Sequence, residues 1–145
     1  MKPKTTLFLG GTTADSTWRD SIIHLLEKEN LPYFNPVVKD WDDDARDKEY
    51  SIKSNPMTIE LYVISKEMSG VFSIAEAVDA SNKKPEQTIF MIKREGFDKG
   101  ALKSLDATSE LIKKNGGKVV ATLEECVKLY KTLSVTQRVV AFLRR

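Results

Sequence analysis

The chain has 145 residues, a length typical of one domain of about 100–150 residues, and we expect residues 1–145 to form a single domain. Its 23 lysine and arginine residues nearly balance its 21 aspartate and glutamate residues, and a net charge of +2 argues against a nucleic-acid-binding protein. The only cysteine, Cys126, and the only histidine, His24, exclude an intramolecular disulfide and a metal site built from these residues. The apolar run at residues 7–9 is too short for a signal sequence or a membrane span, so we expect a soluble, cytoplasmic protein without membrane contact.

The first part of the chain alternates two apolar runs with a helical pattern. Residues 5–9 form a β-branched and apolar run that ends at two glycines, which is typical of a buried strand entering a turn. Asp15 or Ser16 can cap the helix that follows, whose apolar side chains recur at helical spacing. A second strand at residues 33–37 contains Pro36, which places the end of this strand at the rim of a sheet.

The second part of the chain begins with the charge-rich residues 39–55, which predict a solvated loop followed by a polar helix. Residues 58–64 are the strongest strand candidate in the sequence, and residues 71–82 carry apolar side chains on one helical face. The same reasoning predicts a strand at 87–92, a helix over 100–115, a strand at 118–120 and a helix from Leu123 to near the end of the chain.

Strands that alternate with helices predict a parallel sheet with helices on both faces. Five strands in this length fit an α/β, flavodoxin-like three-layer sandwich whose parallel sheet has the order 2-1-3-4-5. Ligands of such sheets bind at the carboxyl ends of the strands, near the switch in strand order. This rule directs attention to the loops at residues 10–17, 35–44 and 65–76.

The loop at residues 10–17 follows the first strand and opens a helix. Its backbone N–H groups and hydroxyls can hold an anion or a sugar, although a tight turn with capping residues explains the same pattern. The third glycine of a dinucleotide-binding loop is missing, and Asp15 would repel a flavin phosphate. We therefore expect no cofactor.

Glu76 lies just after the third predicted strand, among the apolar residues Phe72, Ile74 and Ala75. Its carboxylate is expected to point into a partly desolvated cleft, where it can act as a nucleophile or a general base. An acid near the start of a helix also complements the helix dipole, which is the alternative explanation. For the nucleophilic role we expect the charge of Glu76 to be free of a salt bridge.

Two further stretches stand out. The acidic run at residues 40–49 lacks the spacing of a calcium-binding loop and is typical of solvated surface, so we expect no metal site. Trp41 within this run suits stacking on a base. Near the end of the chain, a dense apolar set must be covered by the domain or by a second subunit: Val135, Val139, Val140, Phe142 and Leu143.

Three motifs together resemble the nucleoside 2-deoxyribosyltransferase-like superfamily over about residues 6–130. They are LFLGGT at residues 7–12 with Trp18 and Arg19, FNPVV at residues 34–38, and LYVI at residues 61–64 followed by GVFSIAE at residues 70–76. The last motif is the most specific. The superfamily carries its nucleophilic glutamate on the helix after the third strand, behind a glycine-containing loop, and Glu76 falls at this position.

The resemblance implies an enzyme that acts on the N-glycosidic bond of a deoxynucleoside or nucleotide, by transfer or by hydrolysis. Glu76 would attack the anomeric carbon, as in a retaining glycosidase, and the glycosyl enzyme would pass the sugar to a second base or to water. It also implies a homo-oligomer.

By position, Gly10 and Gly11 would line the sugar end of the pocket. Trp18, Asn35 and Trp41 would lie near the base, Arg19, Ser69 and Ser73 would hold a phosphate, and Thr12, Asp15, Asp40 and Gly70 complete the expected binding set.

The chain also departs from the superfamily pattern. Ala77, Val78 and Asp79 follow the glutamate, where the familiar form has a bulky aliphatic residue and a glycine. The acidic residue expected several positions before the glutamate is missing, unless Glu67 serves. These departures suit a divergent branch. A non-catalytic nucleotide-sensing module of the same fold is therefore the alternative to an enzyme.

Overall fold

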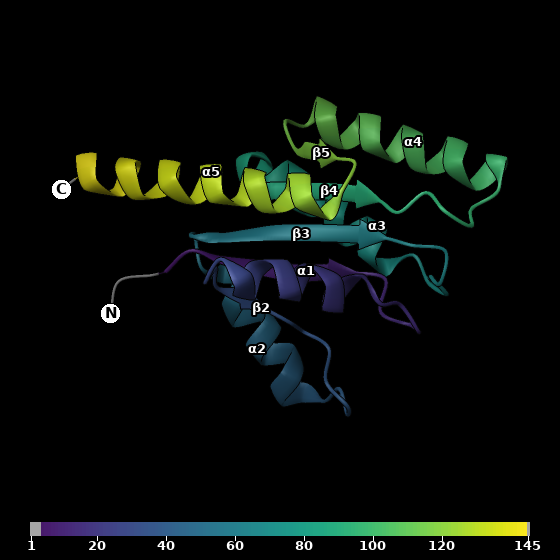
Figure 1. Ribbon diagram of the computed structural model, residues 1–145, viewed down its shortest axis with the longest axis horizontal. Helices are drawn as coiled ribbons and strands as arrows, with labels where there is room; N and C mark the ends of the chain where they lie inside the picture. The colour runs from purple at the N-terminus through teal and green to yellow at the C-terminus, as the bar shows by residue number, and fades with distance from the viewer. Residues whose placement is uncertain (1–3, 145) are drawn as a thin grey trace.

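The computed structural model describes residues 4–144, in which strands and helices alternate along the chain (Figure 1). The elements in chain order are β1 (Thr6–Gly11), α1 (Trp18–Lys28), β2 (Tyr33–Phe34), α2 (Asp43–Ser54), β3 (Thr58–Ile64), α3 (Phe72–Lys83), the short 3₁₀ helix η1 (Pro85–Gln87), β4 (Thr88–Ile92), α4 (Lys99–Lys114), β5 (Lys118–Val120) and α5 (Leu123–Leu143).

The five strands form one parallel sheet in the order β2-β1-β3-β4-β5, which confirms the predicted fold class and strand order. β1 and β3 lie side by side at the point where the strand order switches. Their register places Phe8 opposite Glu60 and Gly10 opposite Tyr62. Because all strands run the same way, the loops that follow β1 and β3 meet at one edge of the sheet.

Alternating side chains of the strands divide the core into two layers. On one face of the sheet, Leu7, Leu9, Ile59 and Leu61 pack among residues of α1 and α5. On the other face, Phe8, Tyr62, Ile64 and Phe90 pack against residues of α3 and α4. Each fully buried aliphatic or aromatic side chain stabilises the fold by about 1.5–3 kcal/mol. The result is the predicted three-layer sandwich.

The boundaries of the first elements differ from the sequence-based expectation. β1 extends two residues further, to Gly11, while β2 has only two residues because prolines flank it and lack the N–H that a strand needs. α1 begins after Thr17, and neither Asp15 nor Ser16 caps it. The Ser16 hydroxyl donates instead to the Thr12 carbonyl, at 2.8 Å.

α2 is the polar helix predicted within residues 39–55. It begins after Asp42, whose carboxylate accepts a hydrogen bond from the Ala45 N–H at 2.8 Å. Every residue of α2 is at least partly exposed. In Figure 1, α2 is steeply inclined to the strands, whereas α1, α4 and α5 run along them. No residue of α2 is fully buried, in contrast to α1, α3, α4 and α5.

α5 is a single 21-residue helix whose last part extends beyond the sheet (Figure 1). The five apolar side chains noted near the end of the chain, from Val135 to Leu143, are 40–75% exposed. The domain itself therefore does not cover them, although a hydrogen bond of 2.8 Å from the Thr5 hydroxyl to Gln137 Oε1 fastens this part of the helix. Among residues 4–144, no helix is both long and apolar enough to cross a membrane.

Candidate active site

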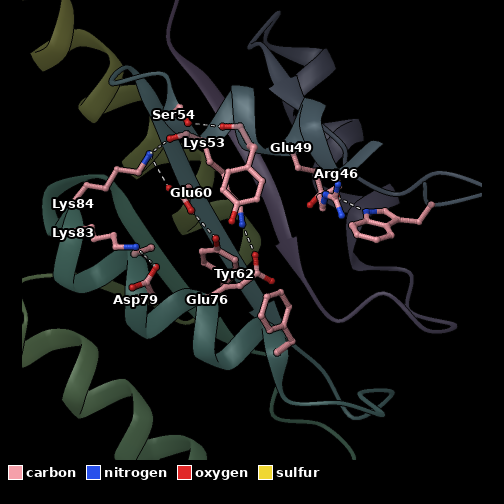
Figure 2. Close-up of a pocket in the computed structure, with 14 residues that line it drawn as sticks. Arg46, Glu49, Lys53, Ser54, Glu60, Tyr62, Glu76, Asp79, Lys83 and Lys84 are labelled. Carbon is pink, nitrogen blue, oxygen red and sulfur yellow. Dashed lines mark hydrogen bonds and ion pairs between the residues drawn. The ribbon is translucent and has the colours of Figure 1, made fainter. Parts of the chain in front are cut away.

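A cavity of about 510 Å³ opens on the α3 face of the sheet, between α2, β3 and α3 (Figure 2). It extends along α3 from Phe72, in the first turn, to Lys84 just past the last turn. The cavity thus continues further along the helix than the carboxyl-end rule predicts.

Glu76 lies on α3 with its carboxylate in this cavity, as expected, and its side chain is 22% exposed. Its Oε2 accepts a hydrogen bond from the ammonium group of Lys53, on the last turn of α2. The expectation that Glu76 is free of a salt bridge was therefore wrong, because sequence spacing did not place α2 opposite α3. Among residues 4–144, no group donates a hydrogen bond to the other carboxylate oxygen, Oε1.

Lys53 reaches Glu76 across an aromatic surface. Its Nζ lies 4.7 Å from the centroid of the Phe8 ring and 5.6 Å from that of Tyr62. A cation over the face of an aromatic ring is attracted by the ring quadrupole, which offsets part of the cost of removing the ammonium group from water. The floor of the cavity therefore helps to fix the cation that contacts Glu76.

A second carboxylate, Glu60, lies buried in the same cavity, on the central strand β3. Its Oε1 accepts a hydrogen bond of 2.6 Å from the Tyr62 hydroxyl, and its Oε2 lies 2.7 Å from Nζ of Lys84. Burial, and then the negative charge of Glu60, raise the pKa of Tyr62 far above its ordinary value, so its hydroxyl stays protonated. Glu60 was missed in the sequence, although a lone acid in an apolar strand was an available signal.

Three exposed aromatic side chains line the cavity. Each of these side chains is more than half exposed. Trp41 lies in the segment before α2, Tyr50 lies on α2, and Phe72 lies in the first turn of α3. The Trp41 indole N–H donates to Glu49 Oε1 at 3.3 Å. Trp41 therefore lies at the same cavity as Glu76, and Tyr50, an aromatic residue in a polar helix, joins it although the sequence analysis did not select it.

A smaller cavity, of about 160 Å³, lies between the loop after β1 and the start of α3. Its lining brings together five residues of the expected binding set, Gly11, Thr12, Ser69, Gly70 and Ser73. Phe72 lines both this cavity and the larger one. The glycine-rich loop and the loop before Glu76 therefore meet, as the sheet topology predicts.

Gly10 lines neither of these two cavities. A Cβ atom at this position would lie 2.5 Å from Cε1 of Tyr62, so glycine leaves room for the Tyr62 ring. Gly11 has a φ of +121°, a conformation that favours glycine, and a Cβ there would overlap the backbone of Val63. Both glycines thus serve close packing of β1 against β3.

Trp18 and Arg19 lie in the buried start of α1 and line neither the larger nor the smaller cavity. The Trp18 indole N–H donates to the Thr12 carbonyl at 2.9 Å, and the Arg19 guanidinium donates to the carbonyls of Leu9, Gly11 and Thr12. Burial lowers the pKa of Arg19 to about 10, and the negative charge of Glu49 offsets part of this effect. Both side chains hold the end of β1 in place.

Asp15, Asn35 and Asp40 are exposed and line neither of these cavities. The Asn35 side chain accepts a hydrogen bond from the Val37 N–H at 3.1 Å and so stabilises a local turn. Within the described part of the chain, no three or more histidine, cysteine or acidic side chains are arranged to hold one metal ion.

The parallel sheet and the acid-bearing cavity on its α3 face are typical of α/β proteins that bind a small ligand near a switch in strand order. The family described as nucleoside 2-deoxyribosyltransferase like matches residues 4–94, well over half of the chain, and the chain belongs to this family. The match spans β1 to β4 and includes Lys53, Glu60 and Glu76. No curated protein and no solved structure gives a significant match.

Proposed function

We propose that the protein is an enzyme that cleaves or transfers the N-glycosidic bond of a deoxynucleoside or nucleotide, with Glu76 as its nucleophile. The observation that carries the proposal is the carboxylate of Glu76 in the larger cavity, held at Oε2 by Lys53 and unoccupied at Oε1 within the described chain. Membership of the nucleoside 2-deoxyribosyltransferase-like family supports the same chemistry.

In the proposed reaction, Oε1 of Glu76 forms a bond to the anomeric carbon while the bond from this carbon to the base nitrogen breaks. The base leaves with the electron pair of the broken bond, and Glu76 becomes a neutral glycosyl ester. A second base or a water molecule then attacks the same carbon and regenerates the carboxylate. Lys53 holds Oε2 in place, which lowers the orientational freedom that Oε1 must lose to attack.

We propose that the exposed aromatic side chains at the cavity bind the base. Trp41, Tyr50 and Phe72 come from three segments that surround the opening, and each offers an aromatic ring to solvent. Stacking of a base on such a ring contributes about 1–3 kcal/mol.

A phosphate on the sugar would lie in the smaller cavity, where hydroxyls of Ser69 and Ser73 flank the start of α3. The N-cap residue of α3, Val71, makes no side-chain hydrogen bond to the helix, and the first turn carries no acid to repel an anion. A nucleoside monophosphate is therefore the second substrate class that we propose, with water as the acceptor.

The ion pair of Glu76 favours a specific alternative. If Lys53 holds the carboxylate too firmly for attack, the protein binds a nucleotide without turnover and acts as a sensing module of the same fold. The departures at Ala77, Val78 and Asp79 suit this alternative as well.

We also propose that the protein is a homo-oligomer. The exposed apolar side chains of the last part of α5, from Val135 to Leu143, are the surface that a second copy would cover.

The test of the enzymatic proposal is base release from a panel of deoxynucleosides and their monophosphates, measured by chromatography. We expect the wild type to release free base, and Glu76→Gln and Glu76→Ala to lose at least about a hundredfold of this activity. Equal activity of the variants and an active wild type would remove Glu76 from the mechanism. A wild type that is inert on the panel but is stabilised by one of its members in a thermal-shift assay would support the sensing module.

A further inference from the structure

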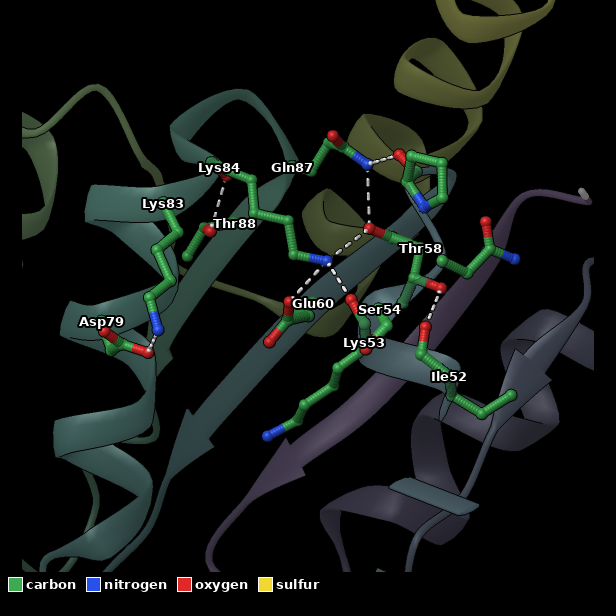
Figure 3. A network of polar contacts seen from close by, with 12 residues as sticks. Ile52, Lys53, Ser54, Thr58, Glu60, Asp79, Lys83, Lys84, Gln87 and Thr88 are labelled. Carbon is green, nitrogen blue, oxygen red and sulfur yellow. Dashed lines mark hydrogen bonds and ion pairs between the residues drawn. The ribbon is translucent and has the colours of Figure 1, made fainter. Parts of the chain in front are cut away.

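α2 forms a wall of the larger cavity, and side-chain donors from other elements hold the backbone carbonyls at its C-terminal end. The Thr58 hydroxyl donates to the Ile52 carbonyl at 2.6 Å, and Nζ of Lys84 donates to the Lys53 carbonyl at 2.9 Å (Figure 3). Lys84 is itself held by the buried carboxylate of Glu60. These contacts hold the C-terminal end of the helix, and Ile52 also packs against the core layer on the α3 face of the sheet.

The Lys53 side chain makes the contact that crosses the cavity. Figure 2 shows it reaching from α2 to Glu76 on α3. Within residues 4–144, this is the one ion pair that joins α2 to α3, and both side chains are about three-quarters buried, at 23% and 22% exposure. Removing one partner of an ion pair that is partly shielded from water costs more than in a fully exposed pair, because the remaining charge is left without its partner.

The proposed chemistry changes this contact in a definite way. When Oε1 bonds to the anomeric carbon and the base leaves with the electron pair, Glu76 changes from an anion to a neutral ester. The ammonium group of Lys53 keeps its charge but loses the negative partner that held it. The attraction between α2 and α3 must therefore weaken when the intermediate forms.

We propose that the Lys53–Glu76 ion pair fastens α2 over the cavity while Glu76 is a carboxylate, and that this fastening is lost when Glu76 carries a sugar as an ester. The first half of the proposal stands on the structure alone, and the second half rests on the proposed function. Lys53 is then a positioning residue for Glu76. The loosened helix gives the second base or water its way to the glycosyl ester.

Hydrogen–deuterium exchange of the α2 amides tests the fastening without any need for activity. Glu76→Gln has the neutral charge of the ester without its sugar, and Lys53→Met removes the cation while keeping most of the length of the side chain. We expect each variant to speed exchange of the α2 amides by about fivefold, because this attraction is one of the contacts that a local opening of the helix must break. Lys53→Arg keeps a cation and should preserve the wild-type exchange rate.

Lys131→Met is the matched control. It breaks another ion pair between two parts of the fold, from α5 to Glu29 next to α1, with an Nζ to Oε1 distance of 3.1 Å. Exchange of α2 should not change in this variant. The β3 amides of each protein serve as the internal reference for global stability.

Unchanged α2 exchange in both Glu76→Gln and Lys53→Met would overturn the proposal. Equally faster exchange in β3 would overturn it too, because the pair would then stabilise the whole fold. Base release by the wild type, measured in parallel, distinguishes failure of the fastening from failure of the proposed function. A wild type that releases no base, with α2 exchange that still responds to the two substitutions, would refute the glycosyl chemistry and support the fastening. In an active wild type, we also expect Lys53→Met to lower kcat more than it changes KM, and Lys53→Arg to restore kcat.

Discussion

Arg19 shows how a buried cation can stabilise the end of a strand. Its guanidinium donates to the carbonyls of Leu9 at 3.0 Å, Thr12 at 2.7 Å and Gly11 at 3.2 Å. A lysine ammonium group is a compact charge that cannot reproduce this planar fork. We expect Arg19→Lys to lower the free energy of unfolding by about 1–3 kcal/mol, measured by urea denaturation, because buried carbonyls lose their donors.

The control for this variant is Arg94→Lys. Arg94 also makes a two-pronged contact, to Asp106, with distances of 2.6 and 3.1 Å, but this pair is exposed to solvent. We expect the exposed substitution to have a much smaller effect on stability. Similar losses in both variants would contradict the role that we assign to burial of Arg19.

We expect the buried thiol of Cys126 to make the free energy of unfolding depend on pH in the alkaline range. Burial raises the pKa of its thiol from 9.0 to about 12, so the unfolded chain loses this proton at lower pH than the folded chain does. The contribution is fully present below pH 9 and is lost as the pH rises toward 12. Between pH 8 and 10, we expect the free energy of unfolding of the wild type to fall by about 1 kcal/mol more than that of Cys126→Ala.

The difference between the wild type and Cys126→Ala isolates the contribution of the thiol to the pH dependence of the free energy of unfolding. Burial also raises the pKa of Tyr130 to about 12, and this tyrosine and Tyr62 remain in both proteins, so their contributions to the pH dependence cancel. Identical slopes in the wild type and Cys126→Ala, measured by urea denaturation at a series of pH values, would show that the thiol is not desolvated as the structure places it.

Sequence reasoning identified Glu76 as the candidate nucleophile but missed its partner. Glu76 follows a glycine-containing loop after a strong strand, and this local pattern is readable in the chain. Lys53 lies 23 positions away on α2, a mostly polar helix. Its few apolar side chains, such as Ile52, are too sparse in the sequence to predict which element the helix packs against. Trp18 and Arg19 were expected near the ligand, whereas the structure buries both against β1.

At the scale of elements, the pairing of β1 with β3 depends on Gly10. A Cβ atom at this position would lie 2.5 and 2.7 Å from two atoms of the Tyr62 ring, so the ring must move. We expect Gly10→Ala to lower the free energy of unfolding by about 1–3 kcal/mol, as overpacking does in a filled core. Urea denaturation measures this loss, and displacement of Tyr62 should weaken its hydrogen bond to Glu60.

Gly70→Ala is the comparison for Gly10→Ala, because nothing lies within 4 Å of a Cβ atom built at Gly70. Its stability should stay close to that of the wild type. If Gly10→Ala were equally stable, the close approach of β1 and Tyr62 would not be a constraint on this position.

Strand order could be predicted because each strand of this sheet, apart from short β2, is an apolar run between helical patterns. The exact ends of the helices and strands could not be predicted. Asp15 and Ser16 are both good capping residues, yet α1 begins later because the loop must first turn the Thr12 carbonyl toward Ser16, Trp18 and Arg19. Tertiary contacts of this kind override local preference and are invisible in the spacing of residues.

At the scale of the whole molecule, the end of α5 offers a test of assembly. We expect the full chain to sediment as a dimer or a larger oligomer, and a chain that ends at Leu133 to sediment as a monomer, because the exposed apolar side chains from Val135 to Leu143 are then removed. Circular dichroism of the shortened chain checks that it is folded. A monomeric full chain would refute the proposed oligomer.

The alternation of side chains along β3 has a practical consequence for engineering. Ile59, Leu61 and Val63 point to the layer of α1 and α5, while Glu60 and Tyr62 point to the side that holds Glu76. The sheet thus separates two core layers, and within residues 4–144 the side chains in one layer do not pack against those in the other. Libraries that redesign the α1–α5 layer for heat tolerance can be screened without changing the side that holds Glu76, and libraries aimed at the proposed substrate range can be confined to the Glu76 side.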